Sequence, residues 1–123
     1  MIMLLRIEKN FQKKSGGIIV IFKEELRKFL RFIKTESEFV QWVDISKNLI
    51  SIENNILLGC TYIPPEYSKY SSPDSYIEVE EELLGFSQNT QNIVILGDFN
   101  ARTSTVNDYI IADEFLHEIS NIE

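Results

Sequence analysis

The sequence predicts a mixed α/β fold, and three features of its 123 residues carry that prediction. Residues 18–22 form an apolar, mostly β-branched run directly after two glycines, which is typical of a buried strand. Residues 93–96 form a second such run, which a glycine follows at once. Between them, residues 75–87 repeat apolar side chains at helical spacing. Strands and helices that alternate in a chain of this length indicate one α/β domain.

Two further strands are expected between the first run and the helix. Residues 39–45 combine aromatic and β-branched side chains, and residues 56–63 form an apolar segment that meets Pro64-Pro65. Because proline cannot donate to a central ladder, the second strand must end there. The connection between the two strands contains Ser51 and Asn54-Asn55, which favour an antiparallel pair.

The two helical patterns differ in strength. Residues 26–33 fit either a short helix or a twisted strand, because their apolar side chains are few. The helix at residues 75–87 has a start signal, in which Ser72 caps it and Pro73 takes the first position. Its expected buried stripe is Tyr76, Val79, Leu83 and Phe86. Its charge run, to which we assign only a solvated surface, is Glu78 and Glu80-Glu81-Glu82.

The remaining segments complete the expected order of elements. Residues 93–96 are continuously apolar, as expected of a strand that is buried on both faces. Apolar residues spaced from Ile111 to Ile119 predict a final helix, with Asp108 as its cap. Residues 6–15 are polar and are expected to form a loop or a frayed end, so we expect no strand there.

Composition limits the class of protein. Eight Phe, five Tyr and one Trp can supply a core, so disorder is not expected. The apolar runs are too short to span a membrane, and the amino terminus lacks the basic region of a signal peptide. The single cysteine, Cys60, excludes an internal disulfide. We therefore expect an intracellular, soluble protein, with nucleus and cytoplasm equally open.

Charge limits the partners and the metals. Residues 1–50 carry ten Lys or Arg against six Asp or Glu, whereas residues 51–123 carry two against thirteen. Because an acidic protein repels nucleic acid at long range, binding would need a local basic face or a metal ion. The basic residues from Lys13 to Lys34 offer such a face, and a solvated surface is the alternative. Oxygen-rich sites for Mg²⁺ or Mn²⁺ are open, because the chain has 19 carboxylates.

The candidate site follows the run at residues 93–96. Ligands of open α/β sheets gather outside the carboxyl ends of strands, where Asp98 stands. Asp98 and Asn100 share one face if the segment is extended, and this pair suits phosphate-ester cleavage. The carboxylate can orient or deprotonate water or bind a metal, the amide can donate to a phosphate oxygen, and Arg102 adds a cation. The alternative is a simple β-turn, because Gly, Asp and Asn are turn formers.

A family resemblance adds to this interpretation. Residues 93–102, Ile-Val-Ile-Leu-Gly-Asp-Phe-Asn-Ala-Arg, resemble the signature strand and loop of the endonuclease/exonuclease/phosphatase superfamily, which has the deoxyribonuclease-I-like fold. The motif is most similar to the endonuclease domains of non-LTR retrotransposons. Residues 15–20 resemble the Gly-Gly-initiated strand of that superfamily, and residues 59–65 resemble its Tyr-x-Pro-Pro strand end. The likeness runs from Ser15 to about Ala112.

The resemblance implies roles for four residues. Asp98 matches the aspartate that positions or activates the attacking water, and Asn100 matches the asparagine that binds the scissile phosphate. Tyr62 matches the tyrosine near the phosphate and leaving group, with a packed core tyrosine as the alternative. Arg102 would touch the nucleic-acid backbone. The implied cofactor is Mg²⁺ or Mn²⁺, the implied partner is DNA, and the implied reaction is phosphodiester hydrolysis.

Two parts of the family pattern do not match this chain. The strand that carries the metal-binding Glu is not seen in residues 1–14, which we treat as a non-matching segment ahead of one partial domain at residues 15–123. The Ser-Asp-His segment is also not seen, because His117, the only histidine, follows Phe and Leu and is expected on a helix surface. The resemblance thus implies a partial two-sheet α/β sandwich of the deoxyribonuclease-I-like type, lacking its amino- and carboxyl-terminal flanking elements.

Three functional hypotheses follow from this mismatch. The chain is a metal-dependent DNA endonuclease, inactive or weakly active in this truncated form, or it is a non-catalytic remnant or interaction module. The module would use exposed sheet edges, which also permit self-association, or the basic amino-terminal half. A phosphatase that acts on small phosphoesters is an alternative within the same fold.

Overall fold

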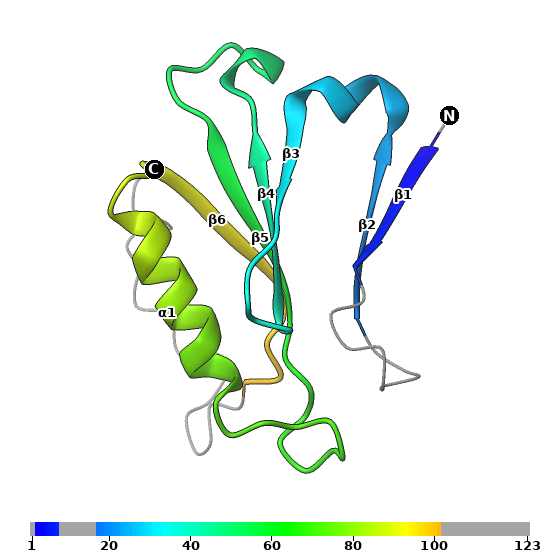
Figure 1. The fold of residues 1–123 in the computed structure, drawn as a ribbon, viewed down its shortest axis with the longest axis vertical. Coiled ribbons are helices and arrows are strands. Elements are labelled where there is room, and N and C mark those ends of the chain that lie inside the picture. Colours follow the sequence, from blue (N-terminus) through cyan, green and yellow to red (C-terminus); the bar gives the residue numbers. More distant parts are fainter. Residues whose placement is uncertain (1, 8–16, 102–123) are drawn as a thin grey trace, which may run out of the picture.

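A mixed α/β architecture is confirmed by the computed structural model, which describes residues 2–7 and 17–101. A four-stranded sheet lies at the centre, with one helix on one side and a two-stranded hairpin on the other (Figure 1). The elements in chain order are β1 (Ile2–Ile7), β2 (Ile18–Lys23), the 3₁₀ helix η1 (Glu24–Phe29), β3 (Leu30–Ile33), β4 (Val40–Ile45), the 3₁₀ helix η2 (Lys47–Leu49), β5 (Ile56–Tyr62), α1 (Ser75–Ser87) and β6 (Asn92–Asp98).

The four-stranded sheet has the order β3-β4-β5-β6. The β3–β4 and β4–β5 pairs are antiparallel, which confirms the expected pairing of the two middle strands. The β5–β6 pair is parallel, and α1 makes the crossover between its strands, as parallel pairing requires. The carboxyl ends of β5 and β6 therefore meet at one end of the sheet.

The main core lies between the sheet and α1. Trp42 of β4 is fully buried and lies against Gly59 of β5, where an added Cβ would approach the indole to 2.7 Å. Its ring contacts Phe86 of α1 at a centroid distance of 5.0 Å. The indole Nε1–H also donates to Glu82 over 3.2 Å, and the backbone N–H of Ser37 donates to the same carboxylate over 3.1 Å. The expectation that Glu82 is merely solvated is therefore wrong.

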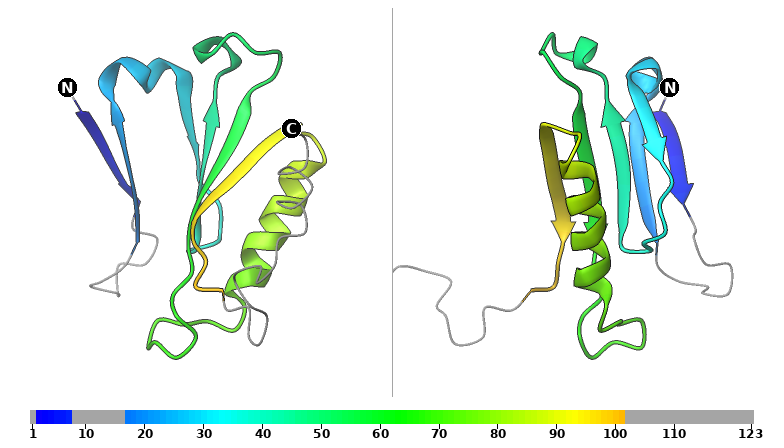
Figure 2. Two further views of the ribbon diagram at one scale, coloured as in Figure 1. Left: turned by 180° about the vertical axis from the view of Figure 1, so that it is seen from behind. Right: turned by 60° about the vertical axis from the view of Figure 1, so that its left-hand side comes forward.

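The hairpin β1–β2 covers only part of the second face of the sheet. The ring of Phe22 in β2 contacts that of Phe32 in β3 at a centroid distance of 5.5 Å, whereas Ile19 and Ile21 point outward. The strand expected at residues 18–22 is therefore confirmed, but its expected burial is wrong because one of its faces is exposed. Two views show the hairpin and α1 on opposite sides of the sheet (Figure 2). On β6, Val94 and Leu96 keep 46% and 51% of their surface exposed. Burial of β6 on both faces is therefore a wrong expectation, because no described element lies over its second face.

Several local expectations are corrected. Residues 26–33 divide between the two open alternatives, since η1 ends at Phe29 and β3 follows from Leu30. A strand at residues 2–7 was not expected, yet β1 pairs along its whole length with β2. The helix begins at Ser75, after Asp74 rather than Ser72, because the Ser72 hydroxyl accepts from the Asp74 N–H and so forms a turn before the helix.

The buried stripe of α1 is also shifted. Val79 is buried and Leu83 and Phe86 pack against the core, as expected, but Tyr76 is 46% exposed. Within the described ranges, no helix has the length and apolar character that a membrane crossing requires. The expected final helix at residues 111–119, together with Asp108, Arg102 and His117, lies outside the described residues.

Candidate functional site

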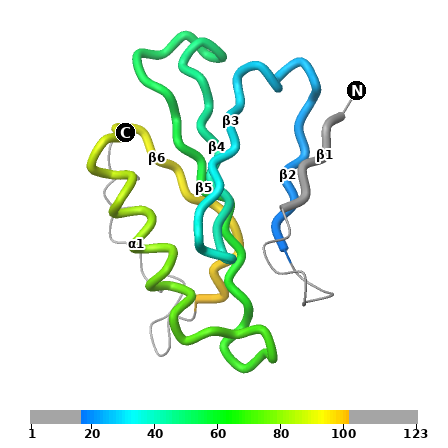
Figure 3. The backbone as a smooth tube through the Cα atoms, viewed as in Figure 1, coloured from blue at the N-terminus to red at the C-terminus, as the bar shows by residue number. Residues whose placement is uncertain are grey.

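The predicted site residues Tyr62 and Asp98 come together at the carboxyl ends of β5 and β6. The parallel register places Tyr62 directly opposite Asp98, and the Ile63 N–H donates to the Asp98 carbonyl over 2.8 Å. Both side chains are exposed, with Tyr62 at 41%. Because side chains alternate along strands, Tyr62 and Asp98 share the second face with Leu96, opposite α1. The backbone path of β5 and β6 to this end can be followed in Figure 3.

Gly97 makes the close approach of these strands possible. Its φ is +142°, a conformation that residues with a side chain rarely adopt. A Cβ at this position would overlap the Thr61 carbonyl oxygen and lie 2.7 Å from the Thr61 carbonyl carbon. Glycine is therefore required where β6 delivers Asp98 to its place beside Tyr62.

Asn100 is held in a turn rather than in an extended segment. Its φ is +45°, and its backbone N–H donates to Asp98 Oδ1 over 2.9 Å. Its side-chain Nδ2 donates to the Ile63 carbonyl over 2.6 Å. The condition under which Asp98 and Asn100 would share one face, an extended segment, is not met, and the chain makes the turn that was the alternative. The turn nevertheless keeps both residues at the end of β5, with one of the two amide N–H bonds of Asn100 used by Ile63.

Sequence reasoning missed the residues that hold this turn. The Tyr76 hydroxyl donates to the Phe99 carbonyl, and the Phe99 ring packs against the core. Tyr76 was expected only as an apolar member of the α1 stripe, although a phenol hydroxyl at the edge of a core usually finds a hydrogen-bond partner. The sequence therefore indicated that the Tyr76 hydroxyl would find a partner, but not which one. The acceptor, the Phe99 carbonyl, lies 23 residues away, beyond the reach of any local pattern.

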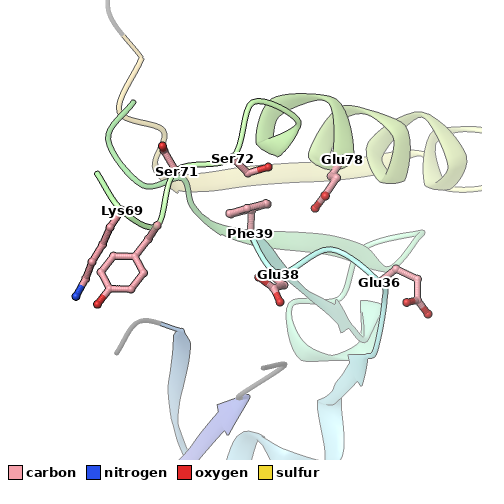
Figure 4. Close-up of a pocket in the computed structure, with 8 residues that line it drawn as sticks. Glu36, Glu38, Phe39, Lys69, Ser71, Ser72 and Glu78 are labelled. Carbon is pink, nitrogen blue, oxygen red and sulfur yellow. The ribbon is translucent and has the colours of Figure 1, made fainter. Parts of the chain in front are cut away.

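An open cavity of about 320 Å³ lies near the site but does not include its predicted residues. Tyr62 is linked to it only by its N–H, which donates to the Phe39 carbonyl over 3.0 Å. Burial, and then the nearby carboxylates of Glu38, Asp74 and Glu82, raises the pKa of Glu78, although a hydrogen bond from Ser37 opposes this. The cavity is lined by Glu36, Glu38, Phe39, Lys69, Tyr70, Ser71, Ser72 and Glu78 (Figure 4).

The described residues do not by themselves fit a resident metal ion. In residues 2–7 and 17–101, no three His, Cys, Asp or Glu side chains gather as a metal site would need. Asp98 therefore offers one carboxylate ligand, but the described residues around it do not supply the further ligands that a metal ion needs. Cys60 lies beside Leu96 in the register, and burial raises the pKa of its thiol, which disfavours the thiolate that metals bind.

The 3₁₀ helix η1, which carries part of the basic segment, lies at the other end of the sheet. η1 leads into Leu30, which pairs with Ile45, at the end of the sheet opposite Tyr62 and Asp98. Within η1, Glu24 and Glu25 balance Arg27 and Lys28, so the element has no net charge. Further along, Arg31 forms an ion pair with Asp44 at 3.1 Å. For η1, a solvated mixed surface therefore fits better than a basic face beside the site.

A comparison with family models, curated proteins and solved structures finds no match to this chain. The geometry of Tyr62, Asp98 and Asn100, together with the two motifs that contain them, is therefore the basis for assigning a function.

Proposed function

We propose that the chain forms part of a phosphodiesterase of the endonuclease/exonuclease/phosphatase type, with DNA as its substrate. One observation carries the proposal: Tyr62, Asp98 and the Asn100 turn converge at the carboxyl ends of two parallel strands. This is where open α/β sheets bind ligands. Asp98 and Asn100 belong to the Gly-Asp-Phe-Asn motif, and Tyr62 is the first residue of the Tyr-x-Pro-Pro motif.

The exposed groups suit attack on a phosphodiester. The Asp98 carboxylate is exposed and keeps Oδ2 for a water molecule, which it can orient or deprotonate. The second amide N–H of Asn100 can donate to a phosphate oxygen without repelling it. The Tyr62 phenol can donate to the phosphate or to the leaving oxygen. Arg102, as the motif implies, would contact the backbone of the substrate.

The metal and the complete fold belong to the proposal as well. A divalent ion, Mg²⁺ or Mn²⁺, would stabilise the negative charge that develops on the phosphate. The described residues do not form a ligand set for this ion. A partial deoxyribonuclease-I-like sandwich is the fold that the proposal expects, and the described residues contribute to it only one aromatic contact between the hairpin and the sheet, that of Phe22 with Phe32.

A cleavage assay with matched charge variants tests the function. The purified chain is incubated with supercoiled plasmid in Mg²⁺ and in chelator, and nicking is followed on a gel. Asp98→Ala removes the proposed base, whereas Glu66→Ala removes an equally exposed carboxylate from the loop that follows β5. Nicking that needs Mg²⁺, is lost in Asp98→Ala and survives in Glu66→Ala supports the proposal. Equal nicking by both variants, or none by the native chain, overturns it for this molecule.

The substrate class is tested with two small esters. Bis(4-nitrophenyl) phosphate is a diester, and 4-nitrophenyl phosphate is a monoester. A diesterase releases nitrophenol from the first in an Asp98-dependent manner. Asp98-dependent release from the second alone would instead indicate the phosphatase alternative.

A second candidate, an interaction module, is favoured by the uncovered second face of β6. Val94 and Leu96 are about half exposed, and β6 is the last strand of the described sheet. Apolar side chains on an edge strand promote pairing with another chain. The expected occupant is a second copy of this chain, and its oligomeric state in solution tests the candidate.

A further inference from the structure

One peptide unit of the site is held at both of its ends. The carbonyl of Phe99 accepts a hydrogen bond from the Tyr76 hydroxyl, and the N–H of Asn100 donates to Asp98 Oδ1 over 2.9 Å. These two groups belong to the same rigid, planar peptide, in which carbonyl and N–H point in opposite directions. Fixing the carbonyl therefore fixes the direction from which the N–H meets the Asp98 carboxylate.

We propose that Tyr76 is a positioning residue, which orients the Asp98 carboxylate through the Phe99–Asn100 peptide. The catalytic meaning of this orientation rests on the proposed phosphodiesterase function. The orientation itself does not, because it follows from the two hydrogen bonds alone. Tyr76 touches neither Asp98 nor a substrate and acts only through the backbone between them.

The need for such an anchor follows from the backbone at Asn100. Its φ of +45° is uncommon for a residue with a side chain, although Asn tolerates it better than most. A peptide flip would exchange this conformation for a commoner one and turn the N–H away from Asp98. The Tyr76 hydroxyl opposes that flip, because the flip would also remove its acceptor.

The position of Tyr76 on α1 suits this role. Tyr76 lies in the first turn of the helix, and Val79 in the next turn is buried against the sheet. The helix is thus fixed by Val79, while Tyr76 keeps 46% of its surface exposed. Its hydroxyl, rather than the burial of its ring, is the group that connects α1 to the Asp98 turn.

Amide exchange of the full chain tests the inference without any assumption about activity. Tyr76→Phe removes only the hydroxyl, and Tyr67→Phe makes the same change on a tyrosine that is 85% exposed in the preceding loop. In Tyr76→Phe, we expect exchange of the Asn100 amide to accelerate about fivefold, the effect of one net hydrogen bond. The amides of β5 and of the rest of α1 should keep their native rates, and Tyr67→Phe should leave every rate unchanged.

Two outcomes would overturn the positioning role. One is an unchanged Asn100 amide in Tyr76→Phe, and the other is equal acceleration across α1 and β6, which would show general loosening. If the native chain cleaves plasmid, Tyr76→Phe should also lower kcat with KM unchanged, whereas a matching rise in KM would count against the role. If the native chain does not cleave, the proposed function fails while the exchange result still decides the role of Tyr76.

Discussion

Replacement of Gly97 by alanine should separate β5 from β6 at the site. An alanine Cβ would overlap the Thr61 carbonyl oxygen, and it would lie 2.9 Å from the Thr61 nitrogen. All of these atoms belong to the backbone, so no side-chain rotation can relieve the contact. The strain must appear either as a distorted φ at residue 97 or as a wider gap between the strands.

The loss of stability can be estimated from two contributions, the strained backbone at residue 97 and the loss of one hydrogen bond between the strands. A side chain at a φ reserved for glycine costs about 2 kcal/mol. Loss of the hydrogen bond from the Ile63 N–H to the Asp98 carbonyl adds about 1 kcal/mol. A decrease of about 3 kcal/mol in the free energy of unfolding is a large share of the roughly 5–15 kcal/mol that a domain has.

Urea denaturation followed by circular dichroism measures this loss. With a slope of about 1.5 kcal/mol per molar urea, the midpoint of Gly97→Ala should fall by about 2 M. Gly85→Ala is the matched control, because beyond its chain neighbours and the backbone of α1 itself nothing lies within 4 Å of the added Cβ. That variant should instead gain about 1 kcal/mol from helix propensity. A Gly97→Ala midpoint equal to the native one would refute the close approach of the strands.

Three further predictions concern α1 and the uncovered face. Glu82→Ala should lower the free energy of unfolding by about 2 kcal/mol, because the buried indole N–H of Trp42 loses its acceptor. The control Glu81→Ala, on the exposed side of α1, should change it by less than about 0.5 kcal/mol; urea titrations measure both. Because the pKa of Glu78 is raised in the folded state, its protonated carboxyl group favours folding below the ordinary carboxyl pKa, and this contribution is lost as the pH rises through the folded value. Glu78→Gln should therefore raise the urea midpoint at pH 7 but not at pH 4. Leu96→Lys should abolish self-association measured by light scattering, because it places a charge on the uncovered face of β6. Leu84→Lys, at a similarly exposed position on α1, should preserve it. Equal association in both variants would exclude the second face as the interface.

The elements with strong periodicity were predictable from the sequence. The strands near residues 40–45, 56–62 and 92–98 and the helix at 75–87 are confirmed. The helix repeats apolar residues over 13 positions, whereas the strand at 92–98 was recognised from a short continuous apolar run that ends at a glycine. The segment at 24–33 was not predictable, since six residues of η1 and four of β3 are too short to show a period. Strand β1 was missed because it forms by pairing with β2, which is separate in the sequence, and the residues of β1 alone do not indicate that pairing.

The motifs singled out the candidate residues, whose role in a site stays a prediction, but the local geometry of these residues was not predictable. The motif located Asp98 and Asn100, and the register brings Tyr62 beside Asp98. The turn at Asn100 and its bond to Ile63 depend on the neighbouring strand, so the local sequence could not reveal them. The exposure of Val94 and Leu96 was mispredicted for a related reason, because apolar content alone does not say which strands have neighbours.

The placement of Trp42 gives the two faces of the sheet different optical signatures. Trp42 is the only tryptophan of the chain, and it lies fully buried against Gly59, Phe86 and Glu82 on the face that α1 covers. Its emission under selective excitation therefore reports the docking of α1, whereas release of the hairpin through Phe22 leaves this fluorophore in the same surroundings. Fluorescence and far-ultraviolet dichroism recorded on the same sample would consequently resolve, without any label, which layer of the protein separates first.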